Sequence, residues 1–137
     1  MREAVARVTA TLAQETGRAG YPLPMSNSDE TPFRHAVRAT LRDLSAQVDA
    51  LDTDALDSRI SDGVFQVDFE GGGTFVVSQQ VPVRELWLSA FARAWHFRAV
   101  EGAWRERDTA EPLERVLSYC FTRKLGVPVQ LRAPAAG

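Results

Sequence analysis

Aspartates are concentrated in the middle of this sequence, at spacings that let their carboxylates act together. Between residues 43 and 70 the chain carries eight acidic residues and a single base, Arg59. Five of them follow the end of one apolar pattern and lead into the next: Asp49, Asp52, Asp54, Asp57 and Asp62. Asp49 and Asp52 are three residues apart, the spacing of neighbours on one side of a helix. Such a concentration of negative charge attracts cations or a basic protein surface and repels nucleic acid.

The other residue types that could do chemistry form no recognisable constellation. His35 and His96 have no neighbouring ligand pattern, and Cys120 lies on an apolar stripe. Gly71–Gly73 is a hairpin turn rather than a phosphate loop, because no helix with a Lys-Ser/Thr pair follows it. Neither a nucleophile elbow nor a pair of catalytic acids is present. The sequence therefore favours binding over catalysis.

Length and composition indicate one globular domain. The 137 residues are 45% hydrophobic and 25% charged, with a net charge of −2. No apolar run approaches the roughly 18–20 residues of a membrane span, so we expect no membrane-spanning helix. The single cysteine excludes an internal disulfide and fits a reducing compartment.

The acidic residues must be positioned by an α-helix that precedes them. Thr31 is expected as the N-cap, with Pro32 at the first helical position. Apolar or small residues then recur at three- and four-residue spacing over about five turns. They are Phe33, Ala36, Val37, Thr40, Leu41, Leu44, Val48 and Leu51.

A second helix is expected near the end of the chain. Thr109 is the predicted N-cap, Glu111-Pro112 fits the first turn, and Gly126-Val127-Pro128 ends the helix. Its expected buried stripe consists of Leu113, Val116, Leu117, Cys120 and Phe121.

Short strands are expected between the two helices, because apolar and polar residues alternate there. The expected strands are Ser58–Ile60, Val64–Phe69, Thr74–Gln79, Glu85–Ser89, Trp95–Ala99 and Ala103–Arg107. The predicted fold is α+β: a two-layer sandwich with two helices packed on one face of an antiparallel sheet of about six strands.

The start of the chain is expected to lie outside this domain. Residues 1–24 are interpreted as an N-terminal extension, flexible or arising from a misassigned start, and residues 25–137 as the domain. Met25 would be a natural first residue, and residues 17–24 have the composition of a linker.

The aromatic motifs and their order resemble the frataxin family, of the bacterial CyaY type. The motifs are Val48-Asp49-Ala50-Leu51-Asp52, Asp62-Gly63-Val64, Gln80-x-Pro82, Leu86-Trp87-Leu88-Ser89, Trp95-His96-Phe97 and Gly102-Ala103-Trp104. The resemblance covers roughly residues 32–131, which is essentially the whole domain.

This resemblance implies an iron-binding accessory protein of iron–sulfur cluster assembly. It implies a cysteine desulfurase and an iron–sulfur scaffold protein as partners, and ferrous or ferric iron as a weakly bound metal. Carboxylate oxygens suit such hard-to-borderline cations. The iron-binding region would be Asp49, Asp52, Asp54, Asp57 and Asp62. The partner-binding residues would be Gln80, Glu85 and Trp87 on the sheet, together with Asp49 and Asp52.

The chain departs from the family pattern in ways that reduce its negative charge. Ser45, Ala46 and Ala50 stand where family members often carry acids, and Arg38 and Arg42 lie on the same flank of the helix. Two alternatives therefore stay open: a ferroxidase or iron-storage protein that uses the same acids, and an iron-free binding module. We expect a cytoplasmic bacterial protein rather than one of the mitochondrial matrix. It would be monomeric, with iron-dependent oligomers as the alternative.

Overall fold

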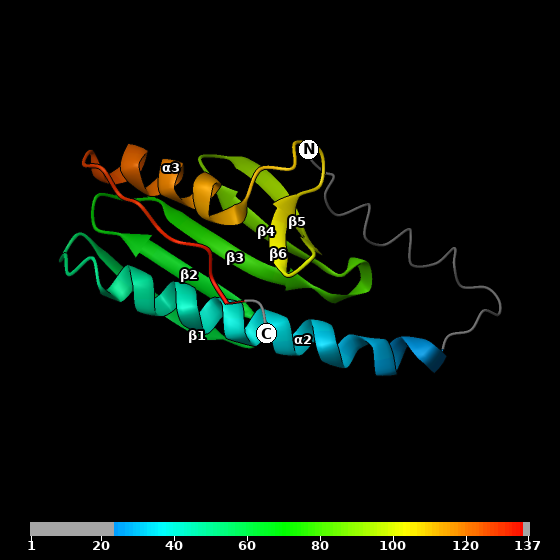
Figure 1. The fold of residues 1–137 in the computed structure, drawn as a ribbon. Coiled ribbons are helices and arrows are strands. Elements are labelled where there is room, and N and C mark those ends of the chain that lie inside the picture. Colours follow the sequence, from blue (N-terminus) through cyan, green and yellow to red (C-terminus); the bar gives the residue numbers. More distant parts are fainter. Residues whose placement is uncertain (1–23, 136–137) are drawn as a thin grey trace.

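The computed structural model describes residues 24–135 and has two layers, a six-stranded antiparallel sheet and two helices on one of its faces (Figure 1). The α+β fold expected from the sequence is confirmed. In chain order the elements are α2 (Pro24–Asp49), β1 (Leu56–Ser61), β2 (Val64–Phe69), β3 (Thr74–Gln80), the 3₁₀ turn η1 (Val81–Val83), β4 (Glu85–Ala90), β5 (Arg93–Val100), β6 (Ala103–Glu106) and α3 (Leu113–Leu125). Residues 1–23, which form most of the expected extension, lie outside the described residues.

Helix α2 starts earlier than its sequence signals indicate. The expected N-cap at Thr31 is wrong, because α2 begins at Pro24 and Pro32 lies inside it. A proline removes one backbone donor and weakens one turn, but it does not force the helix to end there. An ion pair between Arg34 and Glu30 at 3.3 Å spans the same turn.

Helix α3 starts later than expected. Thr109 is not its N-cap; Pro112 holds that position and the helix runs from Leu113. Residues before it form a turn whose backbone N–H groups, at Asp108 and Thr109, donate to the Glu106 carboxylate. The predicted end at Gly126 is confirmed, because this glycine adopts the left-handed conformation (φ 76°) that caps the helix.

The sheet is a simple meander. Its strands pair in chain order, so β1 and β6 form the two edges. All six expected strands are confirmed to within two residues at either end. A two-residue turn at Asp62-Gly63 joins β1 to β2, and a similar one at Glu101-Gly102 joins β5 to β6, all with positive φ.

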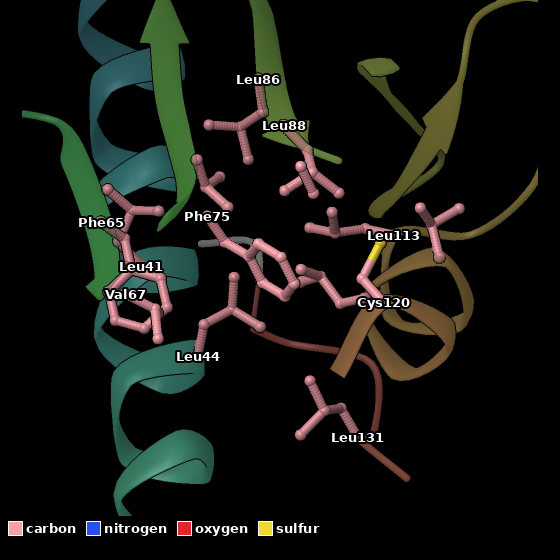
Figure 2. Close-up of a cluster of buried hydrophobic side chains, with 14 of the residues drawn as sticks. Leu41, Leu44, Phe65, Val67, Phe75, Leu86, Leu88, Leu113, Cys120 and Leu131 are labelled. Atoms are coloured by element: carbon pink, nitrogen blue, oxygen red, sulfur yellow. The ribbon is translucent and has the colours of Figure 1, made fainter. Parts of the chain in front are cut away.

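The core lies between the sheet and the helices (Figure 2). Leu41 and Leu44 of α2 are buried against Phe65 and Val67 of β2. Cys120 of α3 is buried in the same core. The five residues of the expected α3 stripe are all buried. Each fully buried leucine or phenylalanine contributes about 1.5–3 kcal/mol, which is why alternation along the strands fixes the face that meets the helices.

The segment after α3 fills the space between the two helices (Figure 1). Val129 and Leu131 are buried there. The Gln47 side chain donates to the carbonyl of Arg132 at 3.1 Å and accepts from its backbone N–H at 2.8 Å. The two helices are therefore joined through residues 126–135, which we call the strap, as well as through the sheet.

Within residues 24–135, neither helix has the length and apolar character needed to cross a membrane.

Candidate functional site

The acidic end of the molecule is built where α2 stops and β1 begins. Asp49 is the last residue of α2, Asp52 and Asp54 lie in the turn, and Asp57 is the second residue of β1. All four side chains are exposed. The turn is held by its backbone instead, since Leu51 N–H donates to the Val48 carbonyl at 3.0 Å.

The four carboxylates of the acidic end make no hydrogen bond or ion pair with any described residue. Their charge is therefore directed to solvent and available to a ligand or partner. We use the name acidic end for Asp49, Asp52, Asp54 and Asp57 from here on.

Two further acids extend this surface, and the sequence prediction had left them out. Asp54 and Asp57 line a shallow depression of about 450 Å³ together with Asp68 and Glu70. Asp57 lies directly opposite Asp68 in the β1–β2 ladder. The turn at Asp62-Gly63 was the available signal, because counting outward from a two-residue hairpin turn gives this pairing.

Asp68 differs from its neighbours because its carboxylate is already engaged. It accepts hydrogen bonds from Gln66 at 3.0 Å and Thr74 at 2.9 Å, and it pairs with Arg59 at 2.9 Å. The hydrogen bonds from Gln66 and Thr74, followed by the bond and charge of Arg59, lower the pKa of Asp68. Asp68 therefore stays ionised and adds negative charge to the depression while its oxygens are occupied.

Asp62 does not belong to the acidic end, and the expectation of one continuous ridge is wrong. It lies in the β1–β2 turn, at the opposite end of β1 from the other four aspartates. It is five positions along the extended chain from Asp57, or roughly 17 Å at ~3.4 Å per residue. Its neighbours are the arginines at positions 34, 38 and 42 of α2.

The acidic end is not a closed metal site. The residues that the structure describes contain no group of three or more His, Cys, Asp or Glu side chains positioned around a common point. Exposed carboxylates of this kind suit a hard cation that exchanges with solvent, or a basic protein surface, better than a permanently held ion.

The second candidate surface lies on the sheet face that carries no helix. Trp87 is half-buried there, and its Nε1–H donates to Glu85 at 2.8 Å. Its ring meets the His96 imidazole edge-on, with centroids 4.6 Å apart. Gln80 donates to the hydroxyl of Ser78, the residue opposite Trp87 on β3. The indole is therefore held in one orientation with part of its ring exposed.

Glu85 is fully buried and cannot touch a partner directly, contrary to the sequence expectation. Besides Trp87, its carboxylate accepts from Arg98 Nε at 2.9 Å and Arg107 Nη1 at 3.3 Å. We call Glu85, Trp87, Arg98 and Arg107 the sheet clamp. Glu85 positions the indole and the two guanidinium groups, so it is a positioning residue.

His96 belongs with this surface, although sequence reasoning treated it as isolated. It lies directly opposite Trp87 in the β4–β5 ladder. Partial burial and the nearby Arg107 charge lower the pKa of His96 below its ordinary value. The imidazole is therefore neutral at pH 7 and packs against the indole without a charge.

Comparisons with known proteins identify the family of this chain. The frataxin-like domain family model matches residues 26–127. The iron-sulfur cluster assembly protein CyaY of Burkholderia mallei is 31% identical over 106 residues, which cover 76% of this chain and 98% of that protein. The protein of the same name from Paraburkholderia phymatum is 31% identical over 107 residues, which cover 78% and 98% of the respective chains.

Solved structures confirm the fold. Frataxin from Psychromonas ingrahamii superposes with a TM-score of 0.69 at 14% identity, over 74% of this chain and 95% of that one. Yeast frataxin superposes with a TM-score of 0.60 at 18% identity, over 80% and 95%. The family model spans the acidic end, all six strands and α3, so this chain belongs to the frataxin family.

Proposed function

We propose that this chain acts in iron–sulfur cluster assembly as an accessory protein that works by contact rather than by catalysis. The acidic end docks on a basic surface of a cysteine desulfurase and holds iron weakly. The open sheet face around Trp87 contacts the scaffold protein. Relatives that the chain matches over three-quarters of its length are named for this assembly process.

The observation that carries the proposal is the set of four exposed aspartates at one end of the domain, whose carboxylates have no partner among residues 24–135. A carboxylate that makes no internal contact contributes little to the fold, and like charges close together oppose folding slightly. Four such carboxylates at one end of the domain are accounted for if they bind something outside the chain.

The test is a reconstituted reaction that contains a cysteine desulfurase and a scaffold protein, followed with and without excess ferrous iron. The wild-type chain should change the rate of cluster formation in an iron-dependent way. Asp54→Lys/Asp57→Lys should abolish the change and weaken desulfurase binding. Glu101→Lys/Glu111→Lys is the matched control, because it reverses two exposed acids remote from the acidic end. Equal behaviour of the two variants would remove the acidic end from the mechanism.

The sheet contact is tested separately. Trp87→Ala should weaken scaffold binding and leave desulfurase binding unchanged, since a partly exposed indole is a typical interface anchor. Tyr119→Ala is the control, because Tyr119 is an aromatic residue that is 53% exposed on α3, in the other layer. A loss of binding by the control equal to that of Trp87→Ala would show that the sheet face is not the contact.

An iron-free binding module is the second candidate. The specific observation in its favour is that the described acids form no three-ligand cluster. It predicts the same desulfurase and scaffold contacts with no effect of ferrous iron on the rate. Iron titrated at low salt should then leave the melting temperature of the wild-type chain unchanged, whereas weak binding would raise it.

A further inference from the structure

A groove runs between α2 and the β1–β2 hairpin, at the opposite end of β1 from the acidic end. Its volume is about 520 Å³. Helix α2 forms one wall, and Ile60, Asp62 and Gly63 of the hairpin form the other, with Gln79 of β3 beside them. Figure 1 shows α2 running along the β1 edge of the sheet. None of these residues takes part in the sites described above.

The helical wall of the groove is basic. Arg34, Arg38 and Arg42 are spaced four residues apart, so they form one row over three successive turns. Arg34 pairs with Glu30, but Arg38 and Arg42 are exposed and make no ion pair with any described residue. Like charges at this spacing destabilise a helix, so the row is unfavourable for the isolated chain.

The floor and the far wall of the groove are suited to an extended peptide. Val37 and Leu41 lie at the bottom, and Ile60 is 42% exposed although it is on the same sheet face as buried Phe65. Within residues 24–135, strand β1 is an edge strand that pairs only with β2. Its outer backbone donors and acceptors can therefore pair with one more strand.

We propose that this arginine groove binds an extended acidic segment of a partner protein, which adds to the edge of β1. Carboxylates of the segment meet Arg38 and Arg42, and an apolar side chain covers Ile60. The proposal does not rest on the proposed function, because neither the acidic end nor the sheet clamp takes part in it.

The spread of the charges favours a segment over a small anion. Arg34 and Arg42 are eight residues apart on α2, which is ~12 Å at 1.5 Å per residue. An extended chain spans that length with about four residues, so two acidic side chains on one side of it reach two arginines. One inorganic anion would reach only part of the row.

The neighbouring acids argue against nucleic acid as the occupant. Asp49 lies two helical turns beyond Arg42 on α2, and the rest of the acidic end follows it. A polyphosphate chain running along the helix would enter this repulsive field, whereas a short acidic segment ends before it.

The experiment measures binding of a short fluorescein-labelled peptide in which glutamate alternates with valine, by fluorescence anisotropy at low salt with the full chain. Wild type should bind, and Arg38→Glu should weaken the affinity by about tenfold or more because a favourable charge becomes repulsive. Arg115→Glu is the matched control, since Arg115 is also an exposed helical arginine without a described ion pair. It should bind as wild type does. Circular dichroism confirms that both variants are folded.

Two further probes separate strand addition from charge attraction alone. A peptide of the same sequence with alternate backbone nitrogens methylated keeps its charges but cannot pair along β1, and it should bind at least about tenfold more weakly. Citrate at an equal concentration of carboxylates should compete poorly. Equal binding of the methylated peptide, or equal competition by citrate, would overturn the strand-addition proposal.

Two other outcomes would also overturn the proposal. One is that the wild type fails to bind the peptide, or that Arg38→Glu and Arg115→Glu bind it equally. The other is that the peptide does not bind while sedimentation shows salt-sensitive dimers of the wild type that Arg38→Glu abolishes. That result would assign the groove to the acidic end of a second copy of this chain.

Discussion

The acidic end and the sheet clamp both contain carboxylates, and the two regions leave them in opposite states. Asp49, Asp52, Asp54 and Asp57 are exposed, and their carboxylates have no partner in the part of the chain that the structure describes. Glu85 is fully buried and accepts hydrogen bonds from three side chains. An unpaired surface carboxylate can exchange partners at little cost to the fold, whereas a buried and paired one fixes the geometry of its neighbours. The first region is suited to transient charge contacts and the second to presenting a rigid surface.

The largest expected effect comes from Glu85→Gln. The substitution keeps the volume but removes the charge that holds Arg98 and Arg107, at the centre of the clamp. Because these arginines are 59% and 36% exposed, water can take over part of their solvation. We therefore expect a loss of about 2 kcal/mol in the free energy of unfolding, less than for a fully buried pair.

Urea denaturation measures the effect of Glu85→Gln, and Asp57→Asn is the exposed counterpart. The comparison between the two regions fails if both substitutions change stability by the same amount. Weaker scaffold binding by Glu85→Gln, with Trp87 intact, would additionally show that the clamp positions the indole.

A smaller effect is expected from pH, and it should arise at His96, which packs against Trp87 of the sheet clamp. The pKa of His96 is lowered in the folded chain by burial and by Arg107. As the pH falls, the unfolded chain therefore takes up the proton first. The stability contribution is complete above the ordinary histidine pKa of about 6.5 and is lost as the pH falls through the lower folded-state value.

Urea titrations at pH 7.5 and pH 5.5 check this prediction. Wild type should lose stability between the two, and His96→Gln should lose less. Identical losses in both proteins would show that His96 is not the group responsible.

The smallest effect is expected from Asp54→Asn/Asp57→Asn. Removing two of several like charges should leave stability unchanged or raise it by up to about 0.5 kcal/mol. Divalent cations at low salt are expected to raise the melting temperature of wild type, and the same variant should lose that increase. Thermal melts with and without the cation test both expectations. A clear destabilisation would show that these carboxylates are structural after all.

Local periodicity was sufficient to predict which segments form helices and strands. The α3 stripe from Leu113 to Phe121 and the alternation in Val64–Phe69 depend only on neighbours along the chain, and both are confirmed. The helix starts were wrong because Thr31 and Thr109 are strong local cap signals that the surrounding structure overrides.

The candidate site was harder to predict because its geometry depends on pairing between strands. Glu85 reads as a polar strand residue, and its burial depends on Arg98 and Arg107, 13 and 22 residues further along the chain. Asp62 was grouped with Asp57 by sequence distance, but an extended strand separates the two. The position of Asp68 could have been predicted from the sequence, because the hairpin turn alone places it opposite Asp57.

The strap between the helices has a consequence for folding during synthesis. Thr40 accepts a hydrogen bond from Trp104 and donates one to the carbonyl of Ala135, 95 residues downstream of it. Gln47 likewise pairs with Arg132, 85 residues downstream. Although α2 is made early, its buried polar groups lack these partners until the ribosome has released the strap. In the nascent chain these polar groups of α2 therefore stay exposed, and the native packing beside α2 forms only after nearly every described residue has emerged.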